Sequence, residues 1–161
     1  MDLWVIRHGL AVDRERFPAD RPDAERPLTK AGAERVRLVA DALGERGVRF
    51  DVLLFSPWRR ALETADLLAP LVDGRLTVTS SLRTAPGPQL LDELDGERCA
   101  VVGHEPWLGE LIGLLVFGDP LLAEGLRLGK AGVAHLRGLP HPGGMVLRAL
   151  DPARTWRTGR G

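Results

Sequence analysis

Short apolar runs alternate with longer stretches of helical spacing along this chain, and this alternation limits the possible folds more than any other feature. Four runs have the length and β-branched content of strands, at residues 3–6, 52–55, 76–78 and 99–102. With the intervening helices their order is β-α-β-α-β, and we expect the strands to be buried on both faces. The sequence therefore predicts an α/β fold, a three-layer sandwich with a mostly parallel central sheet and helices on both faces.

Three stretches carry the helical spacing. The first follows Thr29, a residue type that caps helix N-termini, and ends before Gly44. The second covers residues 61–72, and the third covers residues 108–115 and ends near Gly118.

The remaining segments predict a hairpin and a long loop. Residues 132–137 and 145–150 have strand character and are joined by a turn rich in Pro and Gly, so we expect an antiparallel hairpin at the C-terminus. Residues 13–27 are charged and too long for a simple connection, and loops of this kind often border sites. A basic tail contains Arg154, Arg157 and Arg160, and we expect it to be solvated.

Composition narrows the class of protein. A chain of 161 residues that is 44% apolar fits one domain, residues 1–161. Its 22 basic residues balance 22 acidic ones, which favours neither nucleic acid nor an anionic membrane as a partner. Cys99 is the only cysteine, so no intramolecular disulfide or Cys-rich metal site is expected. Arg7 and His8 interrupt the first apolar run, which is therefore too short for a signal peptide. No apolar run in the sequence approaches the roughly 20 residues of a membrane span. We expect a cytoplasmic protein.

Three polar motifs directly follow predicted strands. They read RHG at residues 7–9, SPWRR at residues 56–60 and GHEP at residues 103–106. Ligands of open α/β sheets bind at the carboxyl ends of the strands, so these motifs should meet at one edge. Pro57 and Pro106 are predicted at the first position of the helices that follow, with free helix N–H groups at the same edge. Arginines, histidines and helix N-termini favour an anion, and phosphate suits them best.

These residues suggest roles in phosphoryl transfer. Like charges nearby should lower the pKa of His8 and keep its imidazole neutral and nucleophilic. Its other ring nitrogen needs a carbonyl to hold it as N–H, and Gly9 is the candidate. Arg7 and Arg60 would bind the phosphoryl oxygens, and His104 would add a donor when protonated. This scheme uses no metal and no other cofactor.

Other residues of the same types have simpler explanations. Neighbouring residues on a helix point about 100° apart, so only one of Arg59 and Arg60 can face the pocket, and we predict Arg60. His135 lies in a predicted strand and His141 in a turn, and we assign both structural or solvated roles.

The motifs RHG, SPWRRALETA and GHE, in this order and over most of the chain, resemble the histidine phosphatase superfamily, also called phosphoglycerate mutase-like. AERPLTKAG at residues 24–32 and GHEPWLGEL at residues 103–111 resemble its small phosphohistidine phosphatase group of SixA type. The resemblance implies that the nucleophile, the two phosphate-binding arginines and the second pocket histidine are His8, Arg7, Arg60 and His104. It further implies that Arg26, in the RPLT-like element, approaches the same pocket.

The chain departs from larger members of the superfamily at one functional point. They carry a Glu or Asp general acid downstream of the second predicted strand, whereas residues 81–87 of this chain contain no carboxylate. An alcohol leaving group needs a proton, but the imidazole of phosphohistidine, with a pKa near 6.5, leaves more readily. The carboxylates that could substitute are Glu105, Asp92 and Glu93, and Glu105 is also a candidate for substrate binding.

The predicted function is that of a metal-independent phosphatase that forms a covalent phosphohistidine on His8. The leading substrate is phosphohistidine on a protein. The first alternative is a small-molecule phosphomonoesterase acting on a sugar phosphate or nucleotide. The second is a non-catalytic phosphate-binding module, against which the intact His8 argues, because binding alone needs cations but no nucleophile.

Overall fold

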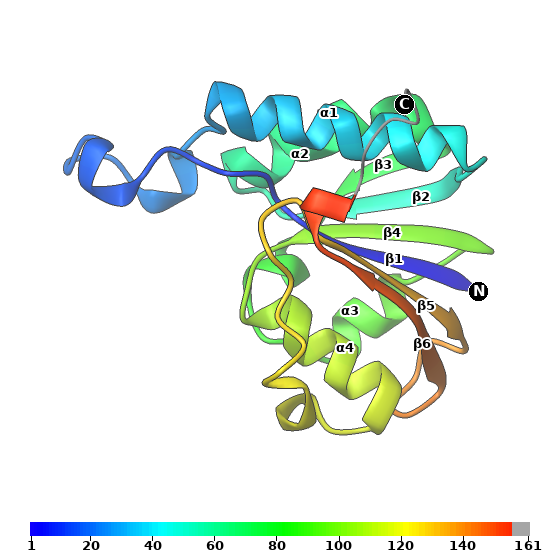
Figure 1. Ribbon diagram of the computed structural model, residues 1–161. Coiled ribbons are helices and arrows are strands. Elements are labelled where there is room, and N and C mark those ends of the chain that lie inside the picture. Colours follow the sequence, from blue (N-terminus) through cyan, green and yellow to red (C-terminus); the bar gives the residue numbers. More distant parts are fainter. Residues whose placement is uncertain (156–161) are drawn as a thin grey trace.

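A computed structural model of the chain describes residues 1–155, so Arg157 and Arg160 of the basic tail lie outside the described residues. Its centre is a six-stranded sheet with the order β3-β2-β4-β1-β5-β6 (Figure 1). The strands are β1 (Asp2–Arg7), β2 (Phe50–Phe55), β3 (Val72–Val78), β4 (Arg98–Gly103), β5 (Val133–Gly138) and β6 (Met145–Asp151). The first four pair in parallel, and β5 and β6 are antiparallel. The mostly parallel sheet and the C-terminal hairpin are confirmed.

Helices cover both faces of this sheet, which confirms the three-layer sandwich (Figure 1). The α-helices are α1 (Lys30–Glu45), α2 (Arg59–Leu68), α3 (Pro88–Glu93) and α4 (Trp107–Phe117). Short 3-10 helices are η1 (Arg14–Arg16), η2 (Asp23–Glu25), η3 (Ala69–Leu71), η4 (Ser80–Arg83), η5 (Pro120–Ala123) and η6 (Ala153–Thr155). Among the described residues, no helix combines the length and apolar character needed to cross a bilayer.

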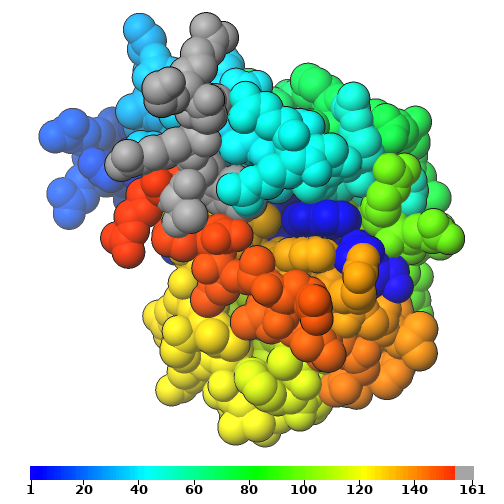
Figure 2. Space-filling view, turned by 45° about the vertical axis from the view of Figure 1, so that its right-hand side comes forward, coloured from blue at the N-terminus to red at the C-terminus, as the bar shows by residue number. Residues whose placement is uncertain are grey.

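Alternate residues of β1 enter two separate cores. Trp4 and Ile6 pack with α1 and α2 on one face, whereas Leu3 and Val5 pack with α4 on the other. The period of two along a strand sends neighbouring side chains to opposite faces, so a central strand between two helical layers is apolar throughout. In the space-filling view, the dark blue start of the chain lies between α1 and the orange hairpin (Figure 2).

The ends of the helices agree with the sequence at two points and differ at others. α1 continues through Gly44 to Glu45, whereas the sequence predicted that it ends before Gly44. Thr29 caps α1 by accepting from the backbone N–H of Gly32 at 2.9 Å, and α4 ends at Gly118 in the left-handed conformation. The second helix is shorter than predicted, since α2 ends at Leu68. Pro70 follows within η3, where its ring and missing N–H are incompatible with a continuing α-helix, so Val72 begins β3 instead.

The third strand is also more exposed than predicted. Among residues 1–155, β3 pairs only with β2 and forms the edge of the sheet, and Leu76 and Val78 are 40% and 55% exposed. Burial on both faces holds for β1, β2 and β4, which lie inside the sheet, and was wrong for this edge strand.

The long loop at residues 13–27 projects from the carboxyl end of the sheet (Figure 1). Its base is closed where the N–H of Val12 donates to Pro27 O at 2.9 Å, next to a bridge between Ala11 and Leu28. From there η2 reaches back to contact α2. We call residues 13–27 the strap.

Candidate active site

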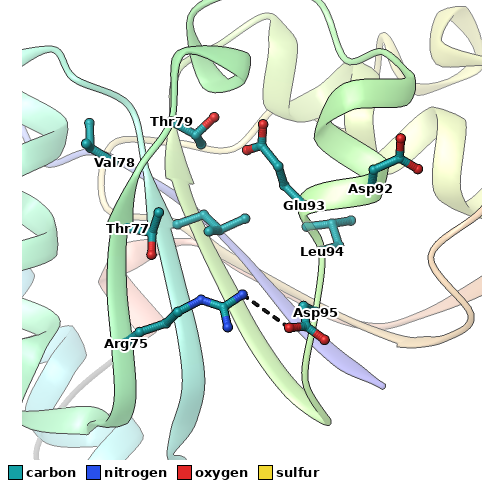
Figure 3. Close-up of a pocket in the computed structure, with 9 residues that line it drawn as sticks. Arg75, Thr77, Val78, Thr79, Asp92, Glu93, Leu94 and Asp95 are labelled. Carbon is teal, nitrogen blue, oxygen red and sulfur yellow. Dashed lines mark hydrogen bonds and ion pairs between the residues drawn. The ribbon is translucent and has the colours of Figure 1, made fainter.

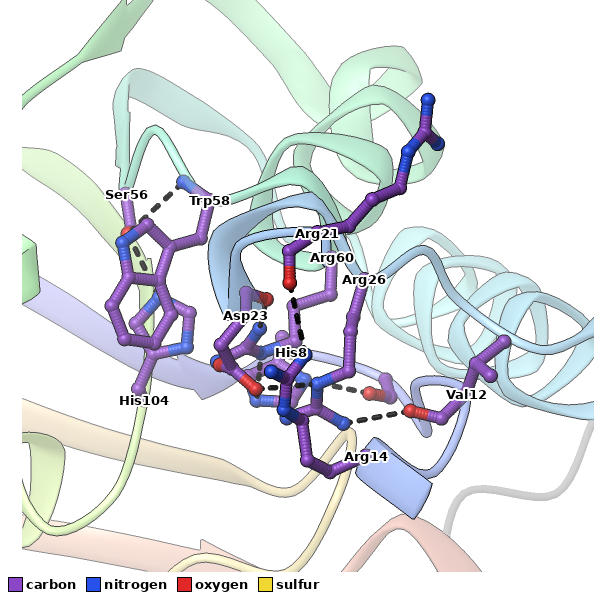
Figure 4. A network of polar contacts seen from close by, with 11 residues as sticks. His8, Val12, Arg14, Arg21, Asp23, Arg26, Ser56, Trp58, Arg60 and His104 are labelled. Carbon is purple, nitrogen blue, oxygen red and sulfur yellow. Dashed lines mark hydrogen bonds and ion pairs between the residues drawn. The ribbon is translucent and has the colours of Figure 1, made fainter. Parts of the chain in front are cut away.

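The sheet brings the three polar motifs together at its carboxyl edge (Figure 4). The N–H of His8 donates to Gly103 O at 3.1 Å, and the N–H of Ser56 donates to Val102 O at 3.0 Å. These bonds extend the pairing of β4 with its two neighbours by one residue. The rings of His8 and His104 consequently lie with their centroids 5.0 Å apart, and both residues are only 3% exposed.

His8 is held with one nitrogen as a donor and the other as an acceptor. Its Nδ1 lies 2.7 Å from Gly9 O, which can only accept, so Nδ1 carries the proton. Its Nε2 accepts from Nε of Arg60 at 3.2 Å. Burial, followed by the charge of Lys130, lowers the pKa of His8 to about 2, so the ring is neutral at physiological pH. Burial thus outweighs the like charges that we invoked from the sequence.

Contacts of Gly9 with Thr64 and α1 hold the backbone that orients the His8 ring. The N–H of Gly9 donates to Oγ1 of Thr64 at 3.1 Å, and the Thr64 hydroxyl donates to Arg60 O at 2.7 Å. A Cβ atom on Gly9 would lie 2.8 Å from Cγ2 of Val36 in α1, so only glycine allows this close approach. The carbonyl that orients His8 is therefore tied to both α1 and α2.

Arg59 and Arg60 separate as the helical spacing predicts. The Arg60 side chain is 5% exposed and its guanidinium carbon lies 4.5 Å from the centre of the Trp58 ring. The Arg59 side chain is 53% exposed and its Nε donates to Glu63 at 2.8 Å, away from His8. Glu63 also accepts from the N–H of Leu28 at 2.7 Å, so its carboxylate joins α2 to the residue that directly follows the strap.

Arg26 approaches the same place through Asp23. Its Nε donates to Oδ1 of Asp23 at 2.7 Å, and its Nη1 donates to Val12 O at 2.7 Å (Figure 4). Asp23 in turn contacts Arg60. Arg26 therefore belongs to the polar network of the pocket without a direct hydrogen bond to His8 among the described residues.

Arg7 enters from the other side of β1. Its Nη1 donates to Leu128 O at 2.7 Å, and its Nε is buried with no hydrogen-bond partner in the described part of the chain. A buried N–H without a partner is rare in proteins. This donor is suited to an oxyanion at the carboxyl edge.

His104 corrects one of our expectations. Burial, followed by the charge of Arg60, lowers its pKa to about 3, so it is not a protonated donor near neutral pH. Its Nε2 lies 2.8 Å from the hydroxyl of Ser56, while its Nδ1 is buried and has no partner within residues 1–155. If the Ser56 hydroxyl donates to Nε2, the neutral ring presents Nδ1–H. His104 can then donate without being charged.

The candidate acids are bound to other groups. Glu105 accepts from the N–H of Leu128 at 2.8 Å and from the N–H of Gly109 at 3.3 Å, and burial raises the pKa of its carboxyl. Glu93 accepts from the hydroxyl of Ser81 at 2.8 Å. Together with Asp92 it lines a cavity of about 430 Å³ beside β3, whose lining includes neither pocket histidine (Figure 3).

The two prolines do not occupy the first helical positions that we predicted. α2 begins at Arg59 after the extended Trp58, which leaves Pro57 outside the helix, and α4 begins at Trp107 with Pro106 as its N-cap. Three residues separate each strand from its helix, so His104 lies in the connection before α4, whereas Arg60 is the second residue of α2.

Lys130 is a site residue that we did not predict. The N–H of the next residue, Ala131, donates to His8 O at 3.1 Å, which places the backbone of Lys130 beside His8. Burial and the charges of Arg7 and Arg60 lower its pKa to about 8. Because β5 is antiparallel, its start and not its end lies at the carboxyl edge of β1. The predicted hairpin was the signal that could have located this lysine.

Two tryptophans also border the site. The Trp58 ring lies 4.5 Å from the His104 ring, and the Trp107 ring lies 6.3 Å from it, between centroids. The two indoles are 6.1 Å apart in an edge-to-face arrangement and are half-buried. They form an aromatic corner against the second histidine.

Comparisons with known proteins agree with this geometry. The chain matches the profile of the histidine phosphatase superfamily (branch 1) over residues 3–85. An uncharacterised protein of Picosynechococcus sp. is 35% identical over 145 residues, which cover 85% of this chain and 85% of that protein.

Solved structures share the fold. The protein histidine phosphatase SixA complexed with tungstate has a TM-score of 0.78 at 22% identity, covering 96% of this chain and 99% of that chain. A putative phosphohistidine phosphatase SixA from Agrobacterium tumefaciens has a TM-score of 0.76 at 20% identity, covering 92% and 96%. A putative alpha-ribazole-5'-P phosphatase from Escherichia coli has a TM-score of 0.73 at 18% identity, covering 100% and 99%. Because the profile match spans more than half of the 161 residues, the chain belongs to the histidine phosphatase superfamily and is a phosphatase.

Proposed function

We propose that this phosphatase transfers the phosphoryl group to Nε2 of His8 without a metal ion, and that its leading substrate is phosphohistidine on a protein. The state of His8 carries the proposal. The ring is buried and neutral, its Nδ1–H is held by Gly9, and its Nε2 lone pair is directed at Arg60. A phosphate-binding module would need the arginines but not this preparation of a nucleophile.

The reaction has two displacements. Nε2 of His8 attacks phosphorus while the bond to the leaving group breaks and the leaving group departs with that electron pair. Because Nε2 has one lone pair, the Nε–H of Arg60 must first exchange its bond to His8 for a bond to an oxygen of the entering phosphoryl group. Water then attacks phosphorus, the electron pair of the Nε2–P bond returns to His8, and inorganic phosphate leaves. Arg7 and Nδ1 of His104 supply further donors to the oxygens.

The placement of the carboxylates supports a leaving group that needs no proton. Asp23 pairs with two arginines, Glu105 accepts from two backbone amides, and Glu93 accepts from a serine hydroxyl. Within residues 1–155, none of the three is hydrogen-bonded to His8 or His104. Imidazole, with a conjugate-acid pKa near 6.5, departs from phosphorus without the help that an alkoxide requires.

The aromatic corner supports the same substrate class. Trp58 and Trp107 are half-buried next to His104 and offer apolar ring surfaces to a planar leaving group. Aromatic rings pack favourably against one another in tilted and stacked arrangements. An imidazole ring fits this environment better than an aliphatic alcohol does.

One observation favours a second candidate, a small-molecule phosphomonoesterase. Lys130 precedes Ala131, whose N–H donates to His8 O, and its charge lowers the pKa of His8. The pKa of Lys130 itself is about 8, which is low enough for it to donate a proton to a departing alkoxide. In that case a sugar phosphate or nucleotide would be the substrate, and Lys130 would replace the carboxylic acid of larger relatives.

Leaving-group dependence tests the proposal. We expect a phosphohistidine peptide and activated aryl phosphates to react in buffer with EDTA, and simple alkyl phosphates hardly to react. A plot of log kcat/KM against leaving-group pKa for aryl phosphates should be steep, because no acid protonates the departing oxygen. Glu105→Gln should leave the slope unchanged.

A shallow slope would contradict the acid-free scheme. If it steepened in Glu105→Gln, Glu105 would be the acid, and if it steepened in Lys130→Met, the phosphomonoesterase would replace phosphohistidine as the leading function. Loss of activity in EDTA would contradict metal independence.

Lys130 also predicts an alkaline limit to activity. Its ammonium is charged below about pH 8 and loses its proton as the pH rises through that value. We therefore expect kcat/KM, which reports the free enzyme, to fall above about pH 8. Lys130→Arg should keep activity at higher pH, and Lys130→Met should lose roughly tenfold at pH 7, as expected for one charged contact to phosphate. An alkaline limb that persists in Lys130→Met would assign it to another group.

A further inference from the structure

Asp23 makes the largest set of contacts between the strap and the phosphate-binding arginines (Figure 4). Its Oδ2 accepts from Nη2 of Arg60 at 3.1 Å, and its main-chain oxygen accepts from Nη1 of Arg60 at 2.9 Å. Its Oδ1 accepts from Nε of Arg26 at 2.7 Å. One residue thus uses all three of its oxygens on two guanidinium groups.

These contacts determine how Arg60 is oriented. Its Nε donates to His8, and both terminal nitrogens donate to Asp23, while Trp58 lies against one face of the guanidinium. A guanidinium has five N–H groups, and the three used in the free enzyme leave two, one on each terminal nitrogen, for phosphoryl oxygens. The Nε–H becomes a third such donor when substrate takes it from His8. Asp23 is the group that sets the plane in which these two donors lie.

The strap holds Asp23 in place. Arg26 links Asp23 to Val12 O at the base of the strap, and Nη1 of Arg14 donates to Arg21 O at 3.1 Å across it. These two hydrogen bonds connect different parts of the strap and hold Asp23 next to Arg60. Its side chain remains 40% exposed, whereas that of Arg60 is 5% exposed.

The charge of Asp23 distinguishes positioning from proton transfer. Burial alone would raise the pKa of its carboxyl, but hydrogen bonds from Arg26 and the charge of Arg60 outweigh burial and hold the pKa below its usual value. The side chain is an anion at neutral pH and has no proton to give. It can orient the arginines, and it cannot serve as the missing general acid.

We propose that Asp23 is a positioning residue of the phosphatase site, which acts through Arg60 by fixing the guanidinium that binds the transferred phosphoryl group. The inference rests on the proposed function only in that Arg60 must bind an oxyanion. The strap then has the role of carrying the carboxylate that orients Arg60.

A double-mutant cycle tests whether Asp23 acts through Arg60. We expect Asp23→Asn to lower kcat/KM for an aryl phosphate by about tenfold in the wild-type background, and by less than about twofold in the Arg60→Ala background. The affinity of the Asp23→Asn single variant for tungstate, measured by isothermal titration calorimetry, should also fall relative to the wild type. The matched control is Glu25→Gln in the same 3-10 helix, since the Glu25 carboxylate is exposed and pairs with the exposed Arg21 at 3.7 Å. This variant should behave as the wild type.

Several results would overturn the proposal. Equal losses in both backgrounds would show that Asp23 acts independently of Arg60, and no loss would show that it has no role. Tighter tungstate binding by Asp23→Asn would show that the carboxylate competes with the oxyanion. Asp23→Ala repeats the cycle with a shorter side chain, and circular dichroism checks the fold. Loss of the fold in both variants would assign Asp23 to stability instead.

The two readouts separate this inference from the proposed function. A wild-type protein that binds tungstate but does not turn over aryl phosphate would contradict the function, and the cycle would still be read from tungstate affinity. A wild-type protein that turns over substrate, with Asp23→Asn equally active, would contradict only the role of Asp23.

Discussion

His8→Ala is expected to fold and to lose turnover of an aryl phosphate by at least about four orders of magnitude, as removal of a covalent nucleophile does. The reason is the Nε2 lone pair, which the surrounding contacts with Gly9 and Arg60 prepare and which alanine cannot replace. Purified protein, circular dichroism and a sensitive colorimetric assay measure both outcomes.

His141→Ala is the matched control for this experiment. His141 is exposed in the turn between β5 and β6, and its Nδ1 lies 3.1 Å from the neighbouring Pro142 O. Its removal should leave the rate unchanged. Activity near the wild-type level in His8→Ala would end the assignment of His8 as the nucleophile.

Arg60→Ala is expected to lower the rate by at least about two orders of magnitude, the scale for removing a preorganised donor to the transition state. Arg7→Ala should cause a loss of similar size. The adjacent Arg59→Ala should cost less than about threefold, because its side chain is exposed and pairs with Glu63. Comparing kcat/KM of the neighbouring variants removes the effect of general charge loss. A greater loss of kcat/KM in Arg59→Ala than in Arg60→Ala would show that Arg59, and not Arg60, is the arginine that binds phosphate.

Much of the fold could be predicted because its signals are local. The apolar runs of β1, β2 and β4 are buried between helical layers, so their sequences are apolar throughout. The edge strand β3 lacks that requirement on its exposed positions. Its first residue, Val72, was therefore predicted in the preceding helix, and only residues 76–78 were predicted as strand. Thr29 and Gly118 mark helix ends through their own side-chain chemistry and backbone freedom.

The site was predictable where its residues directly follow parallel strands. His8, Arg60 and His104 meet because the sheet aligns the carboxyl ends of β1, β2 and β4. Lys130 was missed because it precedes an antiparallel strand, and Asp23 because the path of a long loop depends on tertiary contacts. Neither residue belongs to a motif of its own. The predicted hairpin could have located Lys130, whereas only contacts across the molecule bring Asp23 to the pocket.

The tautomer of His104 could not be predicted either. It depends on the hydroxyl of Ser56, which lies 48 positions earlier in the chain, and on the degree of burial. From the sequence, a second histidine in a phosphate pocket suggested a positive charge. In the folded protein, desolvation lowers its pKa and removes that charge.

Trapping the phosphoenzyme tests the central claim most directly. Wild-type protein mixed with an aryl phosphate and quenched in alkali within the first turnover should carry one phosphate on His8, located by mass spectrometry of its peptides. That phosphate should be stable to alkali and labile to acid, should form with the burst of the phenolate product, and should be absent in His8→Ala. Turnover without phosphate on His8, or phosphate on a different residue, would contradict the account.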